Sequence, residues 1–118
     1  MAYILVIDDD PDTREVLQST LESAGHEVTL CSDGNQGVQQ YRSKQADLVI
    51  TDLYMPGQEG LETIKQLRIE FPDVRIVAIS GKPSGGPMLS VAQRLGAAAT
   101  LAKPFLPEEL LKAVEQAL

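Results

Sequence analysis

Residues 3–10 read YILVIDDD, a run of apolar residues that ends in three consecutive aspartates. An apolar run without polar alternation is typical of a strand that helices cover on both faces of a parallel sheet. The residues that follow this run, Asp10 and Pro11, are a good cap and a good first residue for a helix. The stretch therefore predicts a buried parallel strand, a turn rich in carboxylates, and then a helix.

The same alternation of a short apolar run and a longer amphipathic segment occurs five times along the chain. We expect strands at Tyr3–Ile7, Val28–Cys31, Leu48–Thr51, Ile76–Ile79 and Thr100–Ala102. We expect helices from Pro11 to Gly25, from Gly34 to Lys44, over Leu61 to Phe71, from Pro87 to Leu95 and from Pro107 onward. Right-handed crossovers then predict the α/β class, with a doubly wound, flavodoxin-like, five-stranded parallel sheet in the strand order 2-1-3-4-5.

Apolar residues at helical spacing predict which helix faces are buried. In the first helix these residues are Val16, Leu17, Leu21 and Ala24, and in the last they are Leu110, Leu111, Val114 and Leu118. Cys31 lies in an apolar-alternating run and is expected to be a buried small hydrophobe. His26 follows the first helix without a partner near in sequence, so an exposed side chain with no role is expected.

Size and charge limit the classes of function. The 118 residues are expected to form one domain, 1–118, which buries one core. No segment approaches the roughly 20 apolar residues of a membrane span, and the N-terminus has no basic leader, so a cytoplasmic location is expected. The net charge is −7 and there is no run of Lys or Arg, so nucleic acids and anionic membranes are not expected as direct partners.

Polar residues suited to chemistry follow four of the expected strands. Ligands bind an open parallel sheet outside the carboxyl ends of its strands, where the sequence has Asp8, Asp9 and Asp10, then Asp52, Ser80 and Lys103. The first three aspartates could alone be a solvated helix cap, but Asp52 would bring a further carboxylate beside them. Like charges so close repel, and a cation such as Mg2+ resolves the conflict. With the Lys103 amine added, the set has what phosphoryl transfer to a carboxylate requires.

The expected strand ends carry four motifs, Ile4–Asp9, Thr51–Gly57, Ala78–Gly81 and Lys103–Phe105. Together they closely resemble the receiver domain of response regulators, the family of the chemotaxis response regulator, over essentially the whole chain. The resemblance implies that Asp52 is phosphorylated and that Mg2+ is held by Asp8, Asp9, Asp52 and the backbone carbonyl of Tyr54. It also implies that Ser80 is a switch hydroxyl and that Lys103 pairs with the phosphoryl group, next to a cis Lys103–Pro104 bond.

The function that the resemblance implies is a phospho-accepting switch in a two-component phosphorelay. Its phosphoryl donor would be a phosphohistidine on a sensor histidine kinase or a histidine phosphotransfer protein, docking near Pro11, Arg14 and Leu17. The aspartyl phosphate would add charge and acceptor oxygens that Ser80 and Lys103 meet in one arrangement of their loops, which changes binding to an unknown downstream protein. Such a domain is not an enzyme for other substrates, because it catalyses only its own phosphorylation and dephosphorylation.

Two features depart from the family pattern. Thr100 stands three residues before Lys103, where such domains usually have an aromatic residue, so the usual coupling to an output surface is not assumed. The segment Ser80–Pro87 is rich in Gly and Pro. This composition predicts either a flexible loop that reorders on phosphorylation or plain surface disorder.

Other functions and arrangements remain open from the sequence. A phosphohydrolase of the haloacid dehalogenase type also uses an Asp-x-Asp nucleophile motif, which Asp8-Asp9-Asp10 can mimic, although it would leave Asp52 unexplained. A receiver that only binds a partner and is no longer phosphorylated is a further alternative, although Asp8, Asp9, Asp52, Ser80 and Lys103 are all competent for the chemistry. The chain could be a free-standing domain or the receiver part of a longer regulator.

Overall fold

Five parallel strands form one sheet in the order β2-β1-β3-β4-β5, as predicted. The computed structural model describes residues 1–53, 60–81 and 86–118, without the side chains of residues 86–89. The strands are β1 (Tyr3–Ile7), β2 (Glu27–Cys31), β3 (Leu48–Asp52), β4 (Ile76–Ser80) and β5 (Ala99–Ala102). The helices are α1 (Pro11–Ser23), α2 (Gly34–Ser43), α3 (Gly60–Glu70), α4 (Gly86–Arg94) and α5 (Pro107–Ala117). The predicted order of strands and helices is therefore confirmed.

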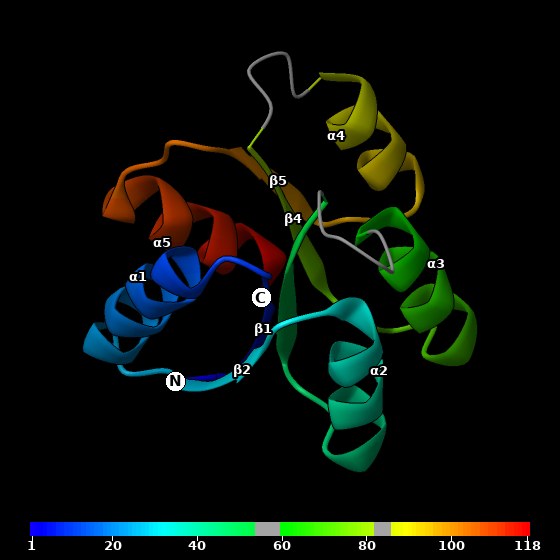
Figure 1. Cartoon of the computed structure of the whole chain (residues 1–118), viewed down its shortest axis with the longest axis horizontal. Coiled ribbons are helices and arrows are strands. Elements are labelled where there is room, and N and C mark those ends of the chain that lie inside the picture. The colour runs from blue at the N-terminus through cyan, green and yellow to red at the C-terminus, as the bar shows by residue number, and fades with distance from the viewer. Residues whose placement is uncertain (54–59, 82–85) are drawn as a thin grey trace.

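The helices cover both faces of the sheet, with α1 and α5 on one side and α2, α3 and α4 on the other (Figure 1). Successive side chains of β1 point to opposite faces, as they must in a strand. Ile4 and Val6 pack into the core under α1 and α5, while Leu5 and Ile7 pack under α2 and α3. This double burial explains why the strand is apolar at every position.

The turn after β1 has the predicted helix cap. Asp10 is the N-cap of α1, where its carboxylate accepts hydrogen bonds from the Asp12 backbone N–H at 3.2 Å and from the Thr13 hydroxyl at 2.7 Å. Pro11 is the first residue of the helix. The aspartates after β1 are therefore held by a helix N-terminus on one side and by the sheet on the other.

Part of the predicted core is wrong. Val16 is 53% exposed, Leu118 is 40% exposed and Ala24 is also exposed. The buried stripe of α1 is narrow and consists of Leu17 and Leu21, four residues apart, so neighbouring apolar residues on the helix turn outward. Leu17 is 1% exposed and cannot belong to a docking surface, which corrects the prediction that it lies at one.

Two smaller predictions have different outcomes. Cys31 is buried, as expected. His26 is not without a partner, because its Nδ1 accepts a hydrogen bond from the Ala2 backbone N–H at 3.0 Å. Ala2 directly precedes β1 and His26 directly precedes the neighbouring strand β2, so the two residues meet although they are 24 residues apart in the sequence. Among the described residues, no helix has the length and apolar character that a membrane crossing needs.

Candidate functional site

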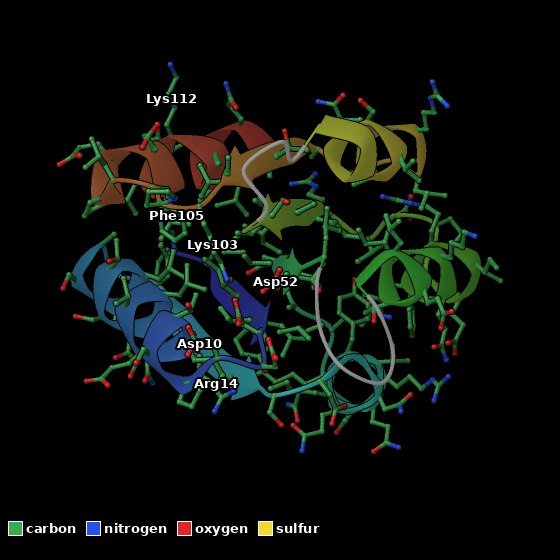
Figure 2. All side chains as sticks on the ribbon, turned by 45° about the horizontal axis from the view of Figure 1, so that its top comes forward. Asp10, Arg14, Asp52, Lys103, Phe105 and Lys112 are labelled. Carbon is green, nitrogen blue, oxygen red and sulfur yellow. The ribbon has the colours of Figure 1, made fainter. Side chains whose placement is uncertain are left out.

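The candidate site lies at the carboxyl end of the sheet, where β1, β3 and β5 deliver charged side chains to one place. β1 and β3 are neighbouring parallel strands in which Ile7 pairs with Thr51, so Asp8, just after β1, and Asp52, the last residue of β3, lie side by side at the sheet edge. Lys103 follows β5 and reaches both carboxylates. Its Nζ lies 3.1 Å from an Asp52 oxygen and 3.2 Å from an Asp8 oxygen. Figure 2 shows Asp52 and Lys103 facing each other in the middle of this edge.

Three carboxylates form a cluster of oxygen atoms. One oxygen each from Asp8, Asp9 and Asp52 lies within 4.8 Å of the others. Asp8 and Asp52 are only 1% and 5% exposed, whereas Asp9 is exposed. A cluster made only of oxygen donors and open to water on one side matches the preferences of Mg2+, which keeps several water ligands. The residues at this edge therefore fit a magnesium ion.

The electrostatics of the cluster favour a bound cation. Burial raises the pKa of Asp8, the Asp10 N–H bonded to its carboxylate lowers it, and the neighbouring Asp52 charge raises it, with a net increase. Burial by itself lowers the pKa of Lys103, but the hydrogen bonds and attraction to Asp52 and Asp8 outweigh it and raise the pKa. Lys103 therefore stays protonated and offsets one negative charge, which leaves the three carboxylates with a net negative charge when ionised.

Backbone contacts that the sequence did not reveal hold Asp8 in place. The Asp10 backbone N–H donates to Asp8 Oδ1 at 2.9 Å, and the Arg14 guanidinium donates to the Asp8 backbone carbonyl at 2.7 Å. Figure 2 shows Asp10 and Arg14 at the start of α1, beside the site. Arg14 was predicted only near a docking surface. An arginine one turn into the helix after an acidic turn was the available signal.

Ser80 and Lys103 are joined through their backbones. Ser80 is the last residue of β4, its side chain is fully buried, and its carbonyl accepts a hydrogen bond from the Lys103 N–H at 2.8 Å. The Lys103–Pro104 bond is cis, as predicted. Asp52 pairs with Ile79 in the sheet, so Ser80 lies one residue further toward the same edge. The predicted carbonyl ligand Tyr54, and residues 82–85 of the Gly- and Pro-rich segment, lie outside the described residues.

A pocket of about 420 Å³ opens beside this cluster, between α1 and the segment after β5. Thr13 and Val16 line it on the helix side, and Lys103, Pro104 and Phe105 line it on the other. The exposed side of Val16 thus faces a hollow next to the charged residues. A partner that contacts α1 at this hollow would also lie beside Lys103.

Comparisons with known proteins agree with this geometry. The family model described as the response regulator receiver domain matches residues 4–115. The chain therefore belongs to the response regulator receiver domain family. Receiver domains of this family are signalling switches of two-component systems. The match supports the receiver prediction over the phosphohydrolase alternative.

Curated relatives are longer regulators. The chain is 38% identical to the DNA-binding transcriptional regulator NtrC of Azospirillum brasilense, covering 99% of this chain and 24% of that protein. It is also 38% identical to the nitrate/nitrite response regulator NarL of Escherichia coli K12, covering 98% of this chain and 54% of that protein. The chain thus spans between about a quarter and about half of the length of these two relatives.

Solved structures share the fold over the whole chain. The chemotaxis protein CheY4 of Vibrio cholerae matches with a TM-score of 0.92 and 31% identity, over 100% of this chain and 99% of that one. The response regulator TrrA of Thermotoga maritima, solved with Mg(2+)-BeF, matches with a TM-score of 0.90 and 30% identity, over 100% of both chains. Both structures are at least 30% identical to this chain, so their shared fold and their sequence similarity support the same family as the family model.

Proposed function

We propose that residues 1–118 form one receiver domain, which accepts a phosphoryl group on Asp52 and then binds a partner protein differently. The observation that carries this proposal is the surroundings of the buried Asp52 carboxylate. The Lys103 ammonium lies 3.1 Å away, and oxygens of Asp8 and Asp9 complete a cluster within 4.8 Å. A nucleophile, an oxygen cluster for a metal and a fixed cation are the parts that phosphoryl transfer to a carboxylate uses.

Asp8, Asp9 and Asp52 would hold Mg2+, and the backbone carbonyl of Tyr54, outside the described residues, would be a further ligand. When bound, the ion supplies positive charge for the oxygens of the transferring phosphoryl group. The carboxylate donors and the exposed Asp9 on the open side support this assignment.

The transfer itself needs little covalent chemistry from the chain. An Asp52 oxygen forms a bond to phosphorus while the bond from phosphorus to the donor imidazole nitrogen breaks, and the imidazole leaves with the electron pair. Lys103 stays protonated and pairs with the new phosphoryl oxygens as it pairs with Asp52 in the unphosphorylated state. The domain would turn over only this phosphoryl group and would act on no other substrate.

The switch would arise from new contacts to the phosphoryl group. The Ser80 hydroxyl and Lys103 would bind its oxygens in one arrangement of the segments after β4 and β5, which shifts the population toward a state with a different partner surface. Loss of Ser80 would weaken the response without preventing phosphorylation. Thr100, half-buried in β5 opposite Ala78, has no aromatic ring to swing, so the usual aromatic coupling would be weak or altered.

The proposed donor is a phosphohistidine on a sensor histidine kinase or a histidine phosphotransfer protein, in the cytoplasm. Its docking surface would be the start of α1, with exposed Pro11, the partly exposed Arg14 and the exposed Val16 beside the pocket. The downstream partner would be a protein. With a net charge of −7, nucleic acid and anionic membranes are not proposed as direct partners.

The test is phosphorylation by a small donor. The protein is mixed with phosphoramidate or acetyl phosphate and Mg2+, and its intact mass is measured, with Asp52→Asn as the control. We expect one phosphoryl adduct that requires Mg2+, is removed by hydroxylamine as an acyl phosphate should be, and is absent from Asp52→Asn. If folded protein forms no adduct with small donors or with a histidine kinase, the proposal fails in favour of an unphosphorylated binding module.

A further inference from the structure

α3 begins with Gly60, whose backbone lies directly against the peptide that links Asp52 to Leu53. A Cβ atom on residue 60 would overlap the Asp52 carbonyl oxygen, and it would lie 2.6 Å from Leu53 Cα and 2.9 Å from the Asp52 carbonyl carbon. Contacts this short do not occur between real Cβ atoms and backbone. Only glycine allows the helix to approach the end of β3 this closely.

Both sides of this contact are held firmly. The Leu53 N–H donates to the Ile79 carbonyl at 2.9 Å, which ties the segment after Asp52 to β4. Leu53 is fully buried and shares one core cluster with Ile64 and Leu67 of α3, which are fully buried as well. Neither the helix nor the strand end can therefore move without disturbing close-packed side chains.

Gly37 in α2 is a useful contrast. A Cβ there would also be too close to its neighbour, but its three nearest atoms all belong to the Ile7 side chain, with Cγ1 at 2.6 Å. The buried Ile7 side chain can shift only at a cost in core packing, but its shift need not move any backbone. The Asp52 peptide, in contrast, can move only together with the carboxylate that Asp52 carries. The two glycines are thus similar in crowding and different in what an added methyl group would displace.

We infer that Gly60 is a positioning residue for the phosphoryl acceptor. Because it has no side chain, α3 can rest on the Asp52–Leu53 peptide and keep the Asp52 carboxylate 3.1 Å from Lys103 and beside Asp8. This inference rests on the proposed function of Asp52. It assigns a role at the site to a residue that does not itself touch the phosphoryl group.

The experiment compares Gly60→Ala with the matched control Gly37→Ala in the full chain. The phosphorylation rate with phosphoramidate is measured at saturating Mg2+, at a temperature where circular dichroism shows both variants folded. Displacement of a reacting group by about 1 Å can slow a reaction about 100-fold, so we expect Gly60→Ala to lose at least about tenfold in rate. Gly37→Ala should keep a rate close to that of the wild-type protein, even if it loses thermal stability.

A second readout does not depend on phosphorylation. Mg2+ is titrated while the backbone amide resonances of Asp52, Leu53 and Lys103 are followed by NMR. Gly60→Ala should shift these resonances in the metal-free protein and weaken Mg2+ binding, and Gly37→Ala should do neither. If the wild-type protein takes no phosphoryl group, the proposed function fails, and this titration still decides the role of Gly60.

Other outcomes would overturn the inference. One is a folded Gly60→Ala protein with the wild-type rate and Mg2+ affinity, and another is an equal loss in both variants. If Gly60→Ala does not fold, both variants are examined at low temperature in sucrose, which favours compact states. If it stays unfolded there while Gly37→Ala folds, the close approach serves the fold and not the orientation of Asp52.

Discussion

Two groups of ion pairs in this molecule differ in a way that distance alone would hide. On the surface, Arg42 of α2 and Glu70 of α3 form a two-bonded pair at 2.7 and 2.8 Å, with side chains 47% and 32% exposed. At the sheet edge, Lys103 makes longer contacts, 3.1 and 3.2 Å, to Asp52 and Asp8, whose side chains are only 6% and 1% exposed. The shorter pair is the one that water and salt can replace.

Burial therefore separates the structural pair from the functional cluster. A charge removed from water is stable only if its partners remain, so losing one partner leaves an uncompensated buried charge. In the part of the chain that the structure describes, the cluster pairs one cation, Lys103, with three carboxylates, whereas Arg42 and Glu70 match one for one. An excess of buried negative charge is what a metal ion and a phosphoryl group can use.

Of the substitutions that test this difference between buried and exposed ion pairs, Lys103→Met should cause the largest loss of stability. Removing the ammonium leaves Asp8 and Asp52 buried together. Because the Lys103 side chain is 21% exposed, we expect a loss of about 3 kcal/mol in the free energy of unfolding, at the low end for a buried pair. The measurement is urea unfolding in metal-free buffer. Lys112→Met is the control, because Lys112 lies on the outer side of α5 and is exposed (Figure 2), and we expect a change within about 0.5 kcal/mol. Equal stability of the two variants would mean that removing a cation from the buried cluster costs no more stability than removing one from the surface.

Mg2+ should act on the cluster and leave the surface pair untouched. An ion that binds only the folded state stabilises it by about 1.4 kcal/mol at ten times its dissociation constant. We expect this increase in the free energy of unfolding, measured by urea unfolding, for the wild-type protein and its loss in Asp9→Asn. Asp9 is exposed, so this substitution should leave the metal-free protein folded. Stabilisation that persists in Asp9→Asn and in Asp52→Asn would place the ion elsewhere.

The surface pair should contribute little. We expect Arg42→Met to lower the free energy of unfolding far less than Lys103→Met does, because exposed pairs gain little Coulomb energy in water. A double-mutant cycle with Glu70→Gln isolates the coupling between the two side chains, and high salt should remove most of it. If the Arg42–Glu70 coupling free energy exceeded the stability lost in Lys103→Met, the surface pair would be the stronger of the two, contrary to the comparison.

The sequence predicts well the features that depend on the spacing of apolar residues and on the position of polar residues at strand ends. Buried parallel strands must be apolar at every residue, so YILVI and LVIT could be identified as strands. The residues after such strands meet at one edge of the sheet, so Asp8, Asp52 and Lys103 could be predicted to converge before any distance was known. The structure brings all three together.

What the sequence does not predict depends on contacts between distant segments. Arg42 and Glu70 are 28 residues apart, and the acceptor of the Arg14 side chain is a backbone carbonyl, so neither bond has a periodic signal. Val16 has the spacing of a core residue but turns outward, where it lines the pocket beside Lys103. The closeness of Gly60 to Asp52 appears only once α3 is packed. These features are properties of packing, which hydrophobic period does not encode.

The smallest expected effect is a pH dependence of stability that has opposite signs for Asp8 in the buried cluster and for Glu70 in the surface pair. Burial is the main reason that the pKa of Asp8 is raised above 3.8, whereas the bond from Arg42 lowers the pKa of Glu70 below 4.5. As the pH rises from below 3.8, the unfolded chain ionises Asp8 before the folded chain does, so this group contributes less stability at higher pH. Glu70 ionises first in the folded chain, and its contribution increases with pH and is lost as the pH falls below 4.5.

Relative to wild type, then, Asp8→Asn should become more stable as the pH rises through this range, and Glu70→Gln should become less stable. The measurement is urea unfolding between pH 3 and pH 7 in metal-free buffer, with both variants compared with the wild-type protein at each pH. Because Glu70 is at the surface, its trend should shrink in high salt, and the trend of the buried Asp8 should persist. Two trends of the same sign would mean that Asp8 is stabilised by Lys103 more than it is destabilised by burial, and the cluster would then resemble the surface pair after all.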